Sequence, residues 1–232
     1  MEMRKSRVLR QMRSGKVATC VKLNLADLRN VDIAAMCGFD CDTLTRVPRG
    51  CYSNLVRPLE ADSTGIMVPH LMSLEDAKQV VYYTKFHPIG RRPIDGGNAD
   101  GAYCLVDEKE YIKTANEERF VVVQIEDPEP MAELEEICAL PGLDMIFFGP
   151  ADYSQGIGHP YECGHPDVVE AKKRVADCAR RHGKFAGTTG SVDNFDELID
   201  LGFTFISTGA DVCGLSDYYS SIVNSVSGKN IK

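Results

Sequence analysis

The chain has 232 residues, a length that suits one barrel or one mid-sized α/β domain, because two independent domains would each be small. Its formal net charge of −8 and pI near 5.2 argue against a nucleic-acid surface, which needs clustered Lys and Arg. Residues 1–13 are basic and polar without an apolar signal core, and no stretch approaches the roughly 20 apolar residues that span a bilayer. We therefore expect a cytoplasmic protein without membrane or nucleic-acid partners.

The nine cysteines include no pair with the CxxC spacing of a redox or zinc motif. Cys20, Cys104 and Cys138 lie in apolar or helical runs, which predicts reduced thiols, several of them buried. Cys163 and His165 are spaced like half of a metal site, but the sequence shows no second half.

Short apolar runs alternate with longer amphipathic runs, which is typical of a parallel α/β fold. In chain order, the first half predicts strand 17–23, helix 28–36 ending at Gly38, a strand stub at 39–41, strand 43–47, helix 52–61, strand 65–68 and a helix that Ser73 begins. An irregular stretch at 86–105 follows. The second half predicts helix 107–116, strand 120–125, helix 128–139, strand 145–148, helix 166–182 closed by Gly183, strand 185–187, helix 192–201, strand 204–207 and helix 217–226.

Eight strand–helix steps can be counted if the stub at 39–41 is included. This count favours a (β/α)8 TIM barrel formed by a single domain, residues 1–232. An open doubly wound sheet is the alternative, although no G-x-G-x-x-G motif begins the first helix.

In a barrel, active-site groups follow the carboxyl ends of the strands. Polar side chains occur at these positions although the strand interiors are apolar, and such groups are costly to bury unless they are paired or bind a ligand. They are Lys22, Arg46, His70, Glu126, Asp152, Thr188 and Asp211.

Glu126 and Asp152 are the predicted metal ligands. Gln124 and Glu126 share one face of an alternating strand, and Asp152 follows the next strand along the chain. Two carboxylates at adjacent strand ends can hold a hard divalent cation. Either carboxylate alone could simply cap a following helix. The pair, beside the backbone N–H groups near Ala151, favours a metal site.

Three basic side chains leave alternatives open. Arg46 suits a carboxylate or a developing enolate oxygen, or it forms an ion pair with Asp40 or Asp42. His70 is either a general base or a polar plug over the barrel mouth. Lys22 is the only lysine near such a position, so it is the one candidate for a Schiff base, and otherwise a charge partner.

The motifs Val-Gln-Ile-Glu126 and Phe-Phe-Gly-Pro-Ala-Asp152 resemble the HpcH/HpaI family of class II, metal-dependent pyruvate aldolases. Weaker similarities fall in the family's order at 66–69, 73–77, 87–92 and 209–211. The resemblance implies a barrel whose last helix packs on a neighbouring subunit, in a hexamer or another trimer-based homo-oligomer.

For the site, the resemblance implies that Glu126 and Asp152 bind Mg2+, Mn2+ or Co2+. Gln124 and the catalytic Arg46 would lie beside a chelated pyruvate, whose carboxylate would meet the amides of Ala151 and Asp152. The implied reaction cleaves a 4-hydroxy-2-oxo acid into pyruvate, or a close 2-oxo acid, and an aldehyde through a metal-bound enolate.

The sequence departs from the family between Cys41 and Asp42. Family members continue the second strand into a segment with a His-Gly pair, whose His belongs to the catalytic base system, and then a full helix. About 30 residues, one βα step, are absent here. A parallel crossover needs about a dozen residues or more, so the barrel cannot close through this connection. Either the natural polypeptide contains a further segment, which we favour because the remaining pattern is intact, or a natural deletion leaves an open, inactive barrel.

The leading hypothesis is therefore a class II aldolase. The alternatives are another pyruvate- or oxaloacetate-enolate C–C lyase with the same metal centre, and a non-catalytic homologue that binds a metal and a 2-oxo acid. The Gly-rich segment 91–100 shapes either the barrel mouth or a subunit contact. Its Arg91 and Arg92 either meet an anionic end of the substrate or, as we favour, are solvated in a loop.

Overall fold

The computed structural model describes residues 1–25, 27, 29–38 and 41–227. The strands are β1 (Ala18–Lys22), β2 (Leu44–Arg46), β3 (Gly65–Val68), β4 (Phe120–Ile125), β5 (Met145–Phe148), β6 (Phe185–Gly190) and β7 (Phe205–Ala210). The helices are α1 (Arg7–Arg13), α2 (Arg29–Met36), α3 (Tyr52–Glu60), α4 (Leu74–Thr84), α5 (Glu108–Glu118), α6 (Leu134–Ala139), α7 (Pro150–Gly156), α8 (Pro166–Arg181), α9 (Phe195–Asp200) and α10 (Asp211–Val226), with 3-10 turns η1 (Ala99–Gly101) and η2 (Glu129–Glu133).

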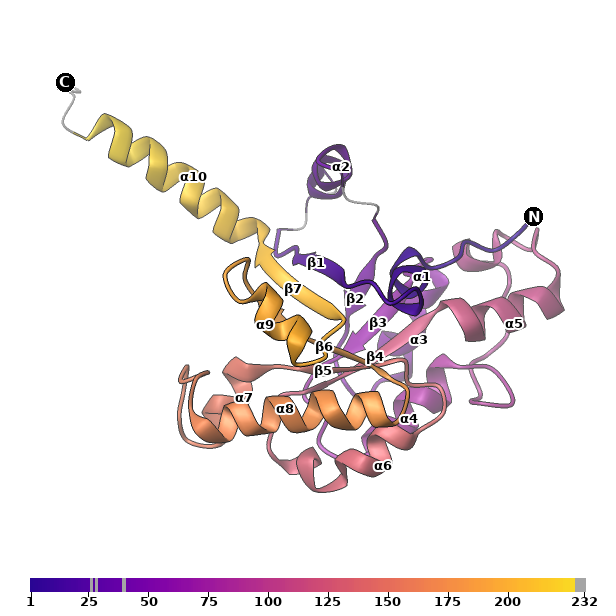
Figure 1. Ribbon diagram of the computed structural model, residues 1–232. Helices are drawn as coiled ribbons and strands as arrows, with labels where there is room; N and C mark the ends of the chain where they lie inside the picture. Colours follow the sequence, from indigo (N-terminus) through magenta and orange to yellow (C-terminus); the bar gives the residue numbers. More distant parts are fainter. Residues whose placement is uncertain (26, 28, 39–40, 228–232) are drawn as a thin grey trace.

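The strands form one curled, seven-stranded sheet in the order β1-β7-β6-β5-β4-β3-β2, and every neighbouring pair is parallel (Figure 1). From β2 to β7, strands that follow one another in the chain are neighbours in the sheet, as short βα crossovers favour. β1 pairs with β7, as the first and last strands of a barrel do, but β1 and β2 are not paired with each other in the described part of the chain. The sheet is therefore open between them.

The connection from β1 to β2 passes through α2, which has no buried residue and stands apart from the body of the molecule (Figure 1). Of the predicted strand stub at 39–41, Phe39 and Asp40 lie outside the described residues, and Cys41 is not in a strand. The count of eight strands therefore falls to seven within the described residues.

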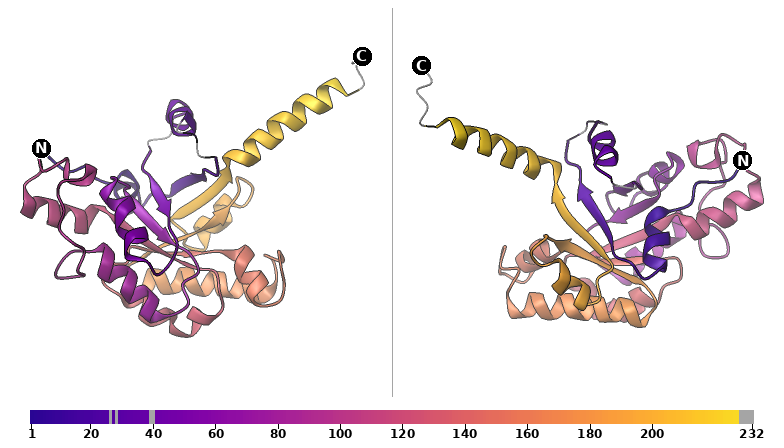
Figure 2. Two further views of the ribbon diagram at one scale, coloured as in Figure 1. Left: turned by 180° about the vertical axis from the view of Figure 1, so that it is seen from behind. Right: turned by 45° about the horizontal axis from the view of Figure 1, so that its top comes forward.

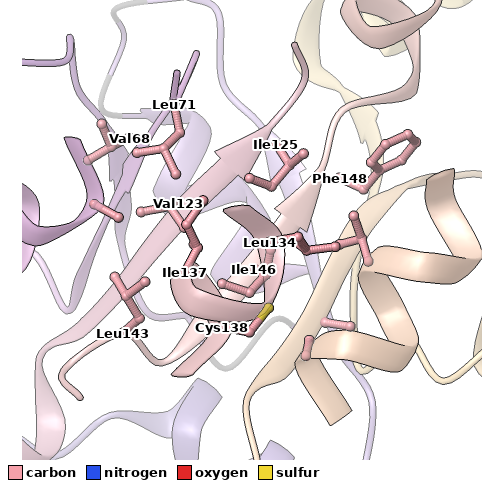
Figure 3. Close-up of a cluster of buried hydrophobic side chains, with 14 of the residues drawn as sticks. Val68, Leu71, Val123, Ile125, Leu134, Ile137, Cys138, Leu143, Ile146 and Phe148 are labelled. Carbon is pink, nitrogen blue, oxygen red and sulfur yellow. The ribbon is translucent and has the colours of Figure 1, made fainter. Parts of the chain in front are cut away.

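The alternation of side chains along the strands divides the core into two layers. Val121, Val123 and Ile125 of β4 point outward, where they pack with α6 and α8 (Figure 3). Phe120 and Val122 point to the inner side, where they join a cluster with Leu9 and Met12 of α1, Met67, Met145, Phe147 and Phe205. α1 therefore packs against the inner face of the curled sheet, and the inward positions farther along the strands are left for polar side chains.

Several predicted boundaries were wrong. The predicted helix 128–139 is a 3-10 turn, η2, followed by α6. The last helix begins at Asp211 rather than at 217. α1 and α7 were not predicted, since each has only seven residues and little apolar periodicity.

The predicted solvation of the Gly-rich segment is wrong for one of its arginines. Arg92 is 4% exposed, donates to Asp100 Oδ2 at 2.6 Å, and lies 4.9 Å from the ring centroid of Phe86. Tyr111 donates to the same carboxylate at 2.9 Å. Arg91, in contrast, is exposed as predicted.

None of the nine cysteines, all of which lie in the described residues, is in a disulfide bond, in line with the predicted reduced state. Cys138 is buried, whereas Cys104 is exposed. Among the helices that the structure describes, none combines the length and apolarity that crossing a membrane requires.

Candidate functional site

Glu126 is the centre of the candidate site. It follows β4 in the same alternation as Phe120, Val122 and Gln124, so its carboxylate lies on the inner side of the sheet and is only 1% exposed. Its Oε2 accepts a hydrogen bond from the side-chain amide of Gln124, which is also buried. The shared face of Gln124 and Glu126 was predicted from the sequence.

Arg46, at the end of β2, reaches this carboxylate from two strands away. Its Nη2 donates to Glu126 Oε1 at 3.1 Å, and its Nε donates to Gln124 Oε1 at 3.3 Å. The alternative pairing with Asp42 is not found, because Asp42 pairs with Arg4 at 3.5 Å. Asp40 lies outside the described residues. About half of the Arg46 side chain remains exposed, so it can also meet a ligand.

His70 completes the contacts around Glu126. Its backbone N–H donates to Glu126 Oε1 at 3.0 Å, and its ring Nε2 lies 3.5 Å from the same oxygen. The ring Nδ1 is 3.0 Å from Asp127 Oδ2. The residue has φ 51°, a left-handed conformation that is uncommon for a side chain with a Cβ. This backbone turn directs the N–H toward the site, and no sequence pattern indicated it.

Asp152 lies opposite Glu126 on the short helix α7. His70, Glu126 and Asp152 each offer one donor atom. These three atoms lie within 4.8 Å of one another, a spacing that could hold a metal ion. Gly149 precedes α7 as its N-cap, and no side chain caps this helix. The Asp152 side chain makes no hydrogen bond with any described residue, so the alternative role as a helix cap is not observed.

Gly149 allows the close approach of the two strand ends. A Cβ at this position would lie 2.8 Å from Glu126 Oε2 and 2.8 Å from Gln124 Nε2. Any larger residue would therefore displace the hydrogen-bonded pair. This role was missed at the sequence level, where only the backbone N–H groups of the Gly-Pro-Ala turn were noted.

The charge balance around Glu126 is incomplete. Burial raises the pKa of its carboxyl above the ordinary glutamate value, and the nearby Asp152 raises it further. His70 and Arg46 lower the pKa but do not cancel the effect of burial. The ionised carboxylate therefore gains from an additional positive charge at this place.

The remaining predicted strand-end residues do not join this cluster. The Lys22 side chain makes no hydrogen bond or ion pair with any described residue. Thr188 is buried and donates to the carbonyl of Phe148 at 3.0 Å. Asp211 accepts hydrogen bonds from the backbone N–H groups of Asn24 and Leu25, at 2.9 and 3.0 Å. These bonds connect the segment after β1 to the start of α10, and they lower the pKa of the Asp211 carboxyl.

Comparison with known proteins identifies relatives over most of the chain. The family model "HpcH/HpaI aldolase/citrate lyase" matches residues 28–217. A hydroxypyruvate/pyruvate aldolase of Cupriavidus necator is 31% identical over 189 residues, 80% of this chain and 70% of that protein. A 2-keto-3-deoxy-L-rhamnonate aldolase of Klebsiella pneumoniae is 30% identical over 181 residues, 77% of this chain and 67% of that protein. A hydroxypyruvate/pyruvate aldolase of Pseudomonas aeruginosa is 29% identical over 239 residues, 91% of this chain and 89% of that protein.

The fold is shared with solved structures. The crystal structure of an HpcH/HpaI aldolase from Desulfitobacterium hafniense superposes with a TM-score of 0.88 and 24% identity, over 97% of this chain and 97% of that one. The family match covers well over half of the chain, and the similar fold agrees with it. The chain therefore belongs to the HpcH/HpaI aldolase/citrate lyase family.

Proposed function

We propose that this protein is a divalent-metal-dependent aldolase, a carbon–carbon lyase that cleaves a 4-hydroxy-2-oxo acid into pyruvate, or a close 2-oxo acid, and an aldehyde. The observation that carries the proposal is the buried Glu126 carboxylate, held by Arg46, Gln124 and His70 and faced by Asp152. The relatives named as pyruvate and keto-deoxy-sugar-acid aldolases support this reaction class.

The residues present fit a divalent cation. Glu126 is buried with a raised pKa, so a cation beside it offsets the cost of keeping it ionised. Gly149 leaves room next to the carboxylate. We assign Glu126 and Asp152 as ligands, since carboxylate oxygens suit Mg2+ and Mn2+, and the neighbouring His70 imidazole also suits Co2+. When bound, the ion acts as a Lewis acid toward the 2-oxo group of the substrate.

The protein's own groups position the substrate and stabilise its charge. The half-exposed guanidinium of Arg46 is the proposed catalytic group, since it can donate to the oxygen on which enolate charge develops. Gln124 holds both Arg46 and Glu126 in place. The backbone N–H groups of Ala151 and Asp152 lie in the first turn of α7, where N–H groups have no partner within the helix. We assign them as hydrogen-bond donors to the substrate carboxylate.

A depression of about 500 Å³ adjoins the site and gives room for the aldehyde half of the substrate. It is lined by Arg46, Val47, Pro48, Arg49, Pro69 and His70.

We further propose that one βα step of a (β/α)8 barrel, carrying the catalytic base, belongs between β1 and β2 in the natural polypeptide. The open edge of the sheet lies between these two strands. The alignment with the Pseudomonas aeruginosa relative spans 239 residues and so is longer than the part of this chain that it covers, since 91% of 232 residues is about 211. One step of a barrel has about 30 residues. An intact mass about 3 kDa above 25.6 kDa would support the proposal, and a mass of 25.6 kDa would contradict it.

The open edge also favours a second candidate function, a non-catalytic homologue that binds a metal and a 2-oxo acid. Within the described residues, His70 is the one imidazole that contacts Glu126, and Asp127 orients its ring. If His70 does not serve as a base and no further segment exists, this chain can bind its ligand without converting it.

We also propose a homo-oligomer in which α10 packs on a neighbouring copy. α10 has no buried residue and projects from the body of the molecule in both views of Figure 2. Its exposed apolar side chains are Val212, Leu215, Tyr218, Tyr219, Ile222 and Val223.

Pyruvate release from a panel of 4-hydroxy-2-oxo acids, with oxaloacetate included, tests the proposed function. A chelator should abolish the activity, and Mg2+ or Mn2+ should restore it. Metal-dependent binding of pyruvate without turnover of any substrate would favour the non-catalytic function. Activity that survives chelation and is trapped by borohydride would instead favour a Schiff base at Lys22 and contradict the metal proposal.

A further inference from the structure

We propose a second metal site, for a borderline-soft divalent cation such as Zn2+, on the outer side of the sheet, formed by Glu135 of α6, Cys178 of α8, and His182 at the end of α8. One donor atom from each of these side chains lies within 4.8 Å of the other two. This site is separate from the candidate aldolase site, and it goes beyond the proposed function.

The sequence spacing explains why these groups meet. Cys178 and His182 are four residues apart, so they lie on the same side of α8, with His182 as its C-cap. α6 packs against α8 through Leu134, Ile137 and Cys138 (Figure 3). The carbonyl of Leu134 accepts a hydrogen bond from the Cys178 thiol at an Sγ···O distance of 3.6 Å. Glu135, one residue after Leu134, then reaches His182, whose Nε2 is 2.8 Å from its Oε2.

The chemistry of the three donors fits zinc rather than magnesium. A thiolate, an imidazole and one carboxylate, with water in the fourth position, are a usual tetrahedral set for Zn2+. Bonds of about 2.0–2.3 Å place tetrahedral ligand atoms roughly 3.3–3.8 Å apart, so the side chains need to move by only about 1 Å. Cys178 is fully buried, whereas the Glu135 and His182 side chains are 53% and 29% exposed, so an ion can reach the thiol from solvent when this pair separates.

Two further side chains, Arg181 and Cys138, contact the proposed ligands. Arg181 pairs with Glu135 and competes with a cation for its carboxylate, but both side chains are more than half exposed, so the pair contributes little and can separate. Cys138 of α6 contacts the Cys178 thiol, yet it is fully buried and is not among the three mutually close donors. We therefore assign it as a neighbour and not as a ligand.

Binding has a defined proton balance. Burial raises the pKa of the Cys178 thiol, so this thiol is protonated near neutral pH in the metal-free protein. Coordination forms the metal–sulfur bond and releases that proton to solvent, while the S–H···O contact to Leu134 is lost. The affinity should therefore fall as the pH is lowered.

Titration of the purified, metal-free protein with Co2+ tests the site, because a cysteine thiolate on Co2+ gives a near-ultraviolet charge-transfer band that the cysteine-free Glu126 cluster cannot give. In Glu126→Gln, which lacks a ligand of the first proposed metal site, we expect the band to saturate at one equivalent and to be displaced by Zn2+. The wild type should give the same band. Cys178→Ser should abolish it, and His182→Gln, a partly exposed change that spares the core, should weaken binding more than about 100-fold. Arg181→Gln should strengthen binding by up to about fivefold.

Cys138→Ala and Cys163→Ala are the matched thiol controls and should keep the full band. No band at one equivalent of Co2+, or a band that persists in both Cys178→Ser and His182→Gln, would overturn the proposal. Loss of the band in Cys138→Ala, with the fold intact by circular dichroism, would overturn the three-residue assignment.

Discussion

Glu126 combines a buried position with a carboxyl pKa raised mainly by that burial. Glu126→Gln removes a proposed ligand, so pyruvate release and Mn2+ affinity should each fall by more than about 100-fold. Exposed Glu129 on η2 provides the control, and Glu129→Gln should leave both unchanged. Retention of Mn2+ binding in both Glu126→Gln and Asp152→Asn would remove the basis of the metal proposal.

In the metal-free protein, Glu126→Gln should preserve or raise the stability at neutral pH, although the same substitution lowers activity and Mn2+ affinity. A raised pKa means that the folded state holds more protons than the unfolded state, so the free energy of unfolding falls as the pH rises from the ordinary glutamate value through the raised one. At pH 7, metal-free Glu126→Gln should therefore be at least as stable as the wild type, and the difference should vanish near about pH 4. Thermal unfolding in chelator at both pH values measures this. A less stable variant at pH 7 would show that Arg46 and His70 outweigh the burial.

Gly149 offers a steric test of the same site. Gly149→Ala places a Cβ 2.8 Å from Glu126 Oε2 and Gln124 Nε2, so the pair must shift. Displacement of catalytic groups by about 1 Å can cost up to about 100-fold in rate, and we expect a loss of at least tenfold. Gly164→Ala is the control, because its added Cβ meets nothing within 4 Å. Equal activity in the two variants would contradict the close packing of β4 and α7.

At the residue level, the sequence predicted those features that depend on short spacing. The shared face of Gln124 and Glu126 follows from strand alternation, and Ser73 caps α4 by accepting from Asp76 N–H at 3.2 Å, as its position predicted. The partner of Arg46 could not be chosen, because Asp42 is nearby in sequence whereas Glu126 is nearby only in space. The left-handed turn at His70 depends on tertiary contacts that no local pattern encodes.

Among the elements, the segment between α4 and α5 is fixed by a buried polar network and not by regular structure. Arg92 and Asp100 are almost completely buried and paired at 2.6 Å, and Tyr111 donates to the same carboxylate. The sequence here is rich in Gly, Pro and Arg, which is why a solvated loop was predicted. The network can be identified only when burial is known, because charged side chains in a loop are usually exposed.

Asp100→Ala should therefore destabilise the protein strongly. Removing one member of a buried ion pair leaves the other charge uncompensated, and we expect a loss of about 3–5 kcal/mol in the free energy of unfolding. Urea unfolding monitored by circular dichroism measures it. The exposed Asp193, on the loop before α9, supplies the control, and Asp193→Ala should change stability by less than about 0.5 kcal/mol. A loss below about 1 kcal/mol in Asp100→Ala would mean that the pair is easily rehydrated.

For the whole molecule, alternating strands and helices predicted the parallel sheet and its sequential order, since consecutive βα steps place strands side by side. The length of the connection from β1 to β2 also indicated that a closed barrel could not form, and the sheet is open at that place. The direction of α10 could not be predicted, because none of its residues is buried against the rest of the chain.

The stability of α10 is not explained by contacts within one copy of the chain, because α10 has no buried residue. An isolated helix of about 16 residues is marginal in water, and its stability normally comes from packing an apolar face. Tyr219 and Val223 are four residues apart on such a face and are about 60% exposed. If α10 packs on a second copy, Val223→Asp should bury an unpaired charge in the interface and shift sedimentation from a trimer-based assembly toward the monomer. Ser225→Asp adds the same charge at a polar position and should leave the assembly intact, whereas a wild-type protein that sediments as a monomer would contradict the proposed packing.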